Sequence, residues 1–102
     1  VGGLAAAMAL ELKGWMDSPA RSIVVEPEAV ACVGAALKVG RVVRLPGDLH
    51  TAAEMLSCGE ASRPAIEILR EAGAEAVTVT ETQLHEAVDV LRECGGPATT
   101  PS

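Results

Sequence analysis

The chain has 102 residues, of which 49% are hydrophobic and 22% charged, and its formal net charge at pH 7 is −6. These proportions are typical of a globular domain, and the acidic balance with a single aromatic residue, Trp15, argues against a nucleic-acid partner. No apolar run approaches the roughly 18 residues of a membrane span, and a signal peptide's basic flank is lacking, so we expect no membrane partner and a cytoplasmic location.

The thiols and imidazoles give no metal-binding pattern. Cys32, Cys58 and Cys94 are odd in number and far apart, which favours reduced thiols that act as small buried or half-buried hydrophobic residues. His50 and His85 lack partners at ligand spacing. We therefore predict no metal site from these residues.

The chain opens with Val1-Gly2-Gly3 before a helix predicted over 4–13 and ended by Gly14. Glycine allows positive φ and close approach of a ligand, and the first amides of a helix have no partner within it. The turn is therefore a potential anion cradle, although a Gly-Gly pair before a helix is more often a simple tight turn. It fits neither the dinucleotide nor the nucleoside triphosphate motif. The helix is apolar nearly all round, which predicts that it is largely buried.

After a connector at 14–20, the β-branched run at 22–26 predicts a strand buried on both sides, as in a parallel sheet. A helix is predicted over 27–39, beginning at Pro27 and stopped by Gly40, and Gly34 within it indicates close packing on a neighbour. The mixed residues of 41–46 predict a short edge strand that Pro46 limits.

The second half repeats the alternation of helix and strand. A turn at 46–48 and a short helix over 51–56 precede a helix that Ser62 caps and Gly73 ends. A strand follows at 76–80, and Thr80 with Gln83 predicts a capping box for a helix over 81–94. This order predicts an α/β fold, part of an open, mostly parallel sheet with flanking helices.

Both ends of the sequence are turn-like, and the first residue is not Met. We expect a piece of a longer polypeptide that completes a larger sheet or pairs with another copy.

Several motifs in order give the sequence a family resemblance. They are Val-Gly-Gly-Leu-Ala at 1–5, Val-Glu-Pro-Glu at 25–28, Ala-Leu-Lys-Val-Gly at 36–40, Ser-Cys-Gly-Glu-Ala-Ser at 57–62, Thr-Glu at 80–81 and Pro-Ser at 101–102. In this order they resemble the latter half of the large domain of fold type II pyridoxal-phosphate enzymes, which include threonine and serine dehydratases. The first motif and the segment 56–60 look closest to diaminopropionate ammonia-lyase. The resemblance implies that 1–102 is a single C-terminal portion of a large domain that binds pyridoxal 5'-phosphate.

The resemblance also implies the residues that contact the cofactor. The family's phosphate-binding loop falls on four residues that act through backbone N–H groups: Val1, Gly2, Gly3 and Leu4. Val1 stands where many relatives have a further glycine. Ser102 matches the start of a segment that lines the active site, which makes it a further cofactor-binding candidate.

Two positions depart from the family pattern. Glu26 matches a residue that binds a divalent cation in some relatives, but the second carboxylate of that site falls near Cys32, so we predict no metal ligand. Glu54-Met55 replaces an Asp-Gly that lies close to the cofactor in dehydratases, and we interpret Met55 as core filler.

The family's Schiff-base lysine lies in a Ser-x-Lys-x-Arg-type setting that this chain lacks, and we interpret Lys13 and Lys38 as solvated charges at helix ends. The resemblance implies a lyase that, in the intact protein, eliminates the β-substituent of a small amino acid of the diaminopropionate, serine or threonine type. The products are a 2-oxo acid and ammonia, the intact protein is expected to be a homo-oligomer, and the fragment is expected to be inactive alone. The alternative is a non-enzymatic α/β module for oligomerisation or small-anion binding.

Overall fold

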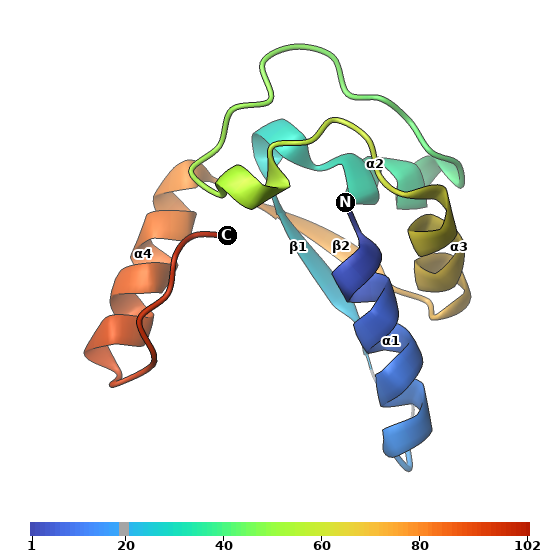
Figure 1. The fold of residues 1–102 in the computed structure, drawn as a ribbon, viewed down its shortest axis with the longest axis horizontal. Coiled ribbons are helices and arrows are strands. Elements are labelled where there is room, and N and C mark those ends of the chain that lie inside the picture. Colours follow the sequence, from blue (N-terminus) through green and yellow to red (C-terminus); the bar gives the residue numbers. More distant parts are fainter. Residues whose placement is uncertain (19–20) are drawn as a thin grey trace.

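The structure, a computed structural model, describes residues 1–18 and 21–102 (Figure 1). In this part of the chain two parallel strands, β1 (Ile23–Pro27) and β2 (Glu75–Val79), pair with Val25 opposite Val77. Helices and two 3-10 turns flank them in the order α1 (Gly3–Trp15), β1, η1 (Glu28–Val30), α2 (Cys32–Val39), η2 (Glu54–Leu56), α3 (Arg63–Glu71), β2, α4 (Glu81–Glu93). The predicted α/β class, with parallel strands and flanking helices, is confirmed.

The core lies where α1, α2 and α3 meet, and small side chains dominate it. The molecule measures 39 × 35 × 16 Å along its principal axes, so it is too thin to bury long side chains on every face. The small residues let the three helices approach closely. The buried cluster consists of Ala6, Ala9, Cys32, Val33, Ala36, Ala61, Ala65, Ile66 and Leu69.

Helix α1 differs from its prediction in length and in burial. It continues to Trp15, because Gly14 does not take a positive φ and the extended Met16 ends the helix instead. Ala6 and Ala9 are its buried residues, whereas the side chain of Leu4 is 80% exposed. The expectation of a largely buried helix is therefore wrong, because α1 packs chiefly on α3 along one stripe of alanines. Of the predicted connector, Pro19 and Ala20 lie outside the described residues.

Strand β1 is covered on one face only. Val24 packs against the core and Glu26 is turned toward α2, while the side chains of Ile23 and Val25 are 49% and 52% exposed. Successive side chains of a strand point to opposite faces, so this alternation shows one covered face and one open face. The predicted burial on both sides is wrong, because α2 covers the Glu26 face and no other described element covers the Ile23 face.

The predicted helix over 27–39 is divided in the structure. Pro27 is the last residue of β1, η1 follows, and Ala31, with ψ of 57°, separates η1 from α2. Helix α2 begins at Cys32 because the Glu26 carboxylate accepts hydrogen bonds from amides in its first turn. Gly40 ends the helix at φ of 78°, as predicted.

The segment between α2 and α3 is less regular than predicted. The edge strand expected at 41–46 is reduced to one antiparallel bridge between Arg44 and Glu60. Pro46 lacks an amide donor, which limits further pairing. The helix expected at 51–56 is the single 3-10 turn η2.

The last two helices begin where the sequence indicated, by different means. Ser62 precedes α3, but its side chain makes no cap bond, so the predicted side-chain cap is wrong. At α4 the capping box is confirmed: Thr80 N donates to Gln83 Oε1 at 2.9 Å, and Gln83 N donates to Thr80 Oγ1 at 3.2 Å. Figure 1 shows α4 on the side of the strands away from α3. Within the described ranges no helix is long and apolar enough to cross a membrane.

Candidate functional site

The turn before α1 leaves several backbone donors open. Gly2 precedes the helix with φ of 95°, makes no side-chain cap, and is followed by no acidic residue in the first turn. In the described part of the chain, the amides of Gly3, Leu4 and Ala5 have no hydrogen-bond acceptor. These amides and the positive end of the helix dipole suit an anion such as phosphate.

Gly2 is required by its surroundings as well as by its backbone angle. A Cβ at Gly2 would lie 3.2 Å from Ala65 Cβ and 3.4 Å from Val33 Cγ2. The turn is also tied to α3, because Ser62 N donates to the Val1 carbonyl at 2.9 Å. The start of α1 is therefore held against both α2 and α3.

A pocket of about 350 Å³ lies between the start of α1 and β1. Its walls are mostly apolar, and Glu26 at the end of β1 is the acidic residue that lines it. Ligands of open α/β sheets bind at the carboxyl ends of the strands, which is where this pocket and the glycine turn meet. The lining residues are Val1, Gly2, Leu4, Ala5, Met8, Ile23, Val24, Val25, Glu26, Val30, Val33 and Leu56.

Ser102 lies beside this region without lining it. Its Oγ accepts a hydrogen bond from Met55 N at 3.4 Å, and the next residue, Leu56, is part of the pocket wall. Met55 itself is 81% exposed. The interpretation of Met55 as core filler is therefore wrong, because the short turn η2 directs this side chain outward while Leu56 faces the pocket.

Comparisons with known proteins show the family of the chain. The family model described as pyridoxal-phosphate dependent enzyme matches residues 1–102. The chain belongs to this family. A crystal structure of a threonine deaminase, from the organism abbreviated T.th., is similar, with 30% sequence identity and a TM-score of 0.88. The similarity covers 98% of this chain and 33% of the threonine deaminase chain, so the sequence spans about a third of that relative. No curated protein matches the chain.

The open amides, the left-handed glycine and the absence of acidic residues from the first turn of α1 suit the phosphate of pyridoxal phosphate, the cofactor of this family. The candidate donors are backbone N–H groups, so a valine side chain at position 1 in place of a glycine does not remove them.

Glu26 is a buried carboxylate in this pyridoxal-phosphate enzyme chain, with 6% of its surface exposed. Its Oε1 accepts from Val33 N at 2.9 Å and its Oε2 from Gly34 N at 2.7 Å. Burial raises the pKa of the Cys32 thiol, and the negative charge of Glu26 raises it further. Sequence reasoning missed the role of Glu26 as the N-terminal partner of α2.

A second anchor, Glu81, holds the segment before η2 against the start of α4. Thr51 Oγ1 donates to Glu81 Oε1 at 2.6 Å, and Ala52 N donates to Glu81 Oε2 at 2.8 Å. Thr51 is 1% exposed. The hydrogen bond from Thr51, followed by that from Ala52, lowers the pKa of the Glu81 carboxyl. Sequence reasoning missed this role of Glu81, since its partners lie 29 and 30 residues away along the chain.

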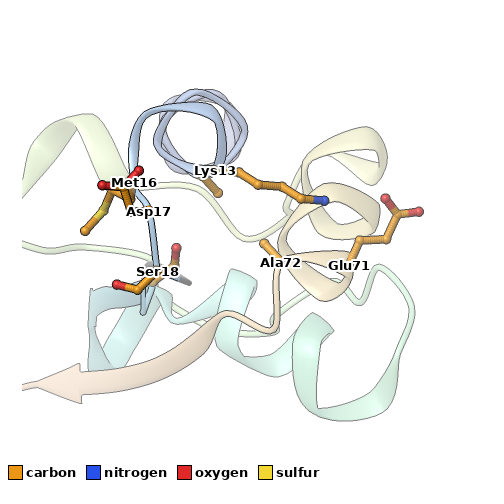
Figure 2. Close-up of a pocket in the computed structure, with 8 residues that line it drawn as sticks. Lys13, Met16, Asp17, Ser18, Glu71 and Ala72 are labelled. Atoms are coloured by element: carbon orange, nitrogen blue, oxygen red, sulfur yellow. The ribbon is translucent and has the colours of Figure 1, made fainter.

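Another pocket, of about 370 Å³, lies at the far end of α1. Figure 2 shows Lys13 extending from α1 toward Ala72 and Glu71 of the α3 end, with Asp17 and Ser18 beyond the helix. Ser22, directly before β1, also lines it, which places it at the amino ends of the strands. Because ligands of open parallel sheets bind at the opposite edge, we do not assign the cofactor to this pocket.

The lysines and cysteines singled out in the sequence lie outside the pocket beside Gly2. Lys13 and Lys38 are exposed in the last turns of α1 and α2, as predicted. The three thiols are free, as predicted, but Cys94 is exposed because α4 has no buried residue, so its predicted burial is wrong. Among the described residues, no three His, Cys, Asp or Glu side chains form a group that could hold a metal ion.

Gly2→Ala is expected to destabilise the protein, since it forces a side chain into a left-handed conformation and against Ala65. The cost is about 1–3 kcal/mol. Gly3→Ala is the matched control, because a Cβ there meets nothing within 4 Å and alanine favours a helix. Chemical denaturation of both variants measures the difference; equal stabilities would contradict the constraint at Gly2.

Glu81→Gln is expected to lower the melting temperature at neutral pH, because the amide cannot accept from both Thr51 and Ala52. A carboxyl whose pKa is lowered by folding contributes stability above its unfolded pKa and loses it as the pH falls through the folded pKa. The difference between the wild type and Glu81→Gln should therefore shrink below about pH 4. Glu86→Gln, an exposed carboxylate on the same helix, is the control. A difference that stays constant from pH 7 to pH 3 would contradict this role.

Proposed function

We propose that the intact protein is a pyridoxal-phosphate dependent lyase of the dehydratase type, and that Val1–Leu4 holds the cofactor phosphate. The single observation that supports this most is the open N-terminus of α1 after the left-handed Gly2, at the carboxyl end of β1. The proposed reaction removes the α-proton of a small amino acid and expels its β-amino group as ammonia or its β-hydroxyl group as water. Hydrolysis of the unsaturated product by one water then releases the α-nitrogen as ammonia and leaves a 2-oxo acid.

In this proposal the chain's own residues bind and orient the phosphate end of the cofactor. The amides of Gly3 and Leu4 donate to phosphate oxygens, and the α1 dipole adds favourable electrostatic energy. The apolar side chains of Met8, Ile23 and Val25 line one side of the pocket. When bound, the cofactor ring withdraws the electrons released when the α-proton of an amino acid is removed.

Ser102 is proposed as a further cofactor contact. Its hydroxyl accepts from Met55 N, which holds it beside a segment whose next residue lines the pocket. A hydroxyl can donate one hydrogen bond while it accepts another, so Ser102 retains a donor for the cofactor.

The fragment is proposed to be inactive alone. Its two lysines, Lys13 and Lys38, are exposed at helix ends and do not line the pocket beside Gly2. The family's lysine would therefore come from a part of the intact protein outside these 102 residues.

The substrate is proposed to be diaminopropionate, serine or threonine. The similar solved structure is a threonine deaminase, and the Leu-Ser-Cys-Gly-Glu segment at 56–60 resembles diaminopropionate ammonia-lyase. Incubating the full-length protein with each amino acid and measuring 2-oxo acid and ammonia tests the assignment. We expect activity on one of the three, with equal amounts of 2-oxo acid and ammonia from serine or threonine. Diaminopropionate would give two ammonia molecules for each 2-oxo acid, because both of its amino groups are released. No product from any of them, with pyridoxal phosphate bound, would refute the proposed reaction.

Leu4→Pro tests the backbone donor directly. Proline removes one amide but is accepted in a first helical turn, as Pro64 is at the second position of α3. We expect the variant of the full-length protein to bind pyridoxal phosphate about tenfold or more weakly, since a charged hydrogen bond is lost. Pyridoxal, which lacks the phosphate, should bind both forms equally.

Leu4→Ala is the control for the leucine side chain, because it keeps the amide. If Leu4→Pro and Leu4→Ala weaken binding equally, the side chain rather than the amide is responsible. If phosphate alone shifts the Gly3 and Leu4 amide resonances while no amino acid reacts, the anion-binding module is the better assignment.

A further inference from the structure

We infer that Glu26 is a positioning residue that holds the phosphate cradle in shape through α2, and that backbone amides take the place of a cation at this carboxylate. The inference rests on the proposed phosphate site at Val1–Leu4. It departs from the resemblance, in which this position binds a divalent cation in some relatives.

Both oxygens of Glu26 are already used. They accept from Val33 N and Gly34 N at 2.9 and 2.7 Å, which are amides of the first turn of α2. The carboxylate is 6% exposed, so these bonds form in a site shielded from water, where the helix dipole also favours negative charge. A cation at Glu26 would have to compete with two charge-assisted hydrogen bonds.

The neighbouring side chains do not complete a cation site. Calcium and magnesium prefer several oxygen ligands, whereas the family resemblance puts the second carboxylate near Cys32, a thiol that is fully buried. A soft cation would need the Cys32 sulfur, which is fully buried within the helix core. The donor set therefore fits amide binding and does not fit a metal ion.

The same two bonds connect Glu26 to the cradle. Val33, whose amide Glu26 holds, places its Cγ2 3.4 Å from the point where a Gly2 Cβ would stand. Gly34 permits the approach, since its Cβ would lie 3.2 Å from Glu26 Oε2. Displacing the carboxylate would shift the start of α2 and with it the surface on which Gly2 rests.

The test uses Glu26→Gln in the full-length protein, with Glu28→Gln as the matched control because Glu28 is exposed two residues away. In the variant an NH₂ group faces a backbone amide, so one hydrogen bond is lost. We expect pyridoxal phosphate to bind about tenfold more weakly, with binding of pyridoxal unchanged and Glu28→Gln like the wild type. Unchanged binding in Glu26→Gln would overturn the positioning role.

Cations are tested separately by melting temperature and by the dissociation constant of pyridoxal phosphate. MgCl₂, CaCl₂ and MnCl₂ up to millimolar concentrations, compared with NaCl of equal ionic strength and with EDTA, should change neither quantity in the wild type. A saturable rise in melting temperature that Glu26→Gln abolishes would overturn the inference.

Two further results keep the tests separable. If Glu26→Gln does not fold, Glu26→Asp keeps the charge on a side chain too short to reach both amides and should weaken pyridoxal phosphate binding in the same direction; unchanged binding would overturn the inference. If the wild type binds pyridoxal phosphate no more tightly than pyridoxal, the proposed phosphate site fails. If it binds the phosphate form more tightly and Glu26→Gln does so equally, only the role of Glu26 fails.

Discussion

The constraint on which the rest of the structure depends is the lack of a side chain at Gly2. At this point the start of α1 lies against Ala65 of α3 and Val33 of α2, and there is no space for a Cβ at ordinary contact distance from Ala65. The buried alanines of α1 and α3 extend the same close approach along the helices. The direction of α1, and hence of its open amides, follows from this contact.

The start of α1 differs from those of α2 and α4. The start of α2 is satisfied by Glu26 and that of α4 by the Thr80 and Gln83 capping box. Helix α3, like α1, has neither a side-chain cap nor an acidic residue in its first turn, but Pro64 there removes one donor. Helix α1 has neither a cap nor an acidic residue at its start, and it is the helix that opens onto the pocket with Gly2. Its unsatisfied amides are stable only if water or an anion binds them.

Local patterns predicted most of the fold, and they failed where tertiary contacts decide the outcome. The capping box, the stop at Gly40 and the close packing at Gly34 all depend on nearby residues or on one missing side chain, and the structure confirms them. The division of 27–39 into η1 and α2 was not predictable in this way, since a carboxylate preceding the helix sets its start.

Burial was the least predictable property. The β-branched run of β1 and the alanines of α1 indicate side chains suited to a dry environment, but they carry no information on which elements cover them. In the structure one helix covers one face of β1, so Ile23 and Val25 remain half exposed. The 33% coverage of the threonine deaminase chain shows that the related fold contains many residues that this chain does not match.

In the candidate site, too, local features were predictable from the sequence and tertiary contacts were not. The candidate phosphate cradle could be predicted from the sequence because a backbone site needs only glycine and a helix start, both of which are local features. The contacts of Glu26 with α2 and of Thr51 with Glu81 are made by polar side chains. In the sequence nothing distinguishes these side chains from other polar residues. Their roles follow from their positions at the ends of parallel strands, since Glu26 lies near the end of β1 and Glu81 begins the helix after β2. Glu26 accepts from two backbone amides, and Glu81 accepts from one backbone amide and the Thr51 hydroxyl, so each carboxylate fixes a neighbouring segment at the carboxyl edge of the sheet.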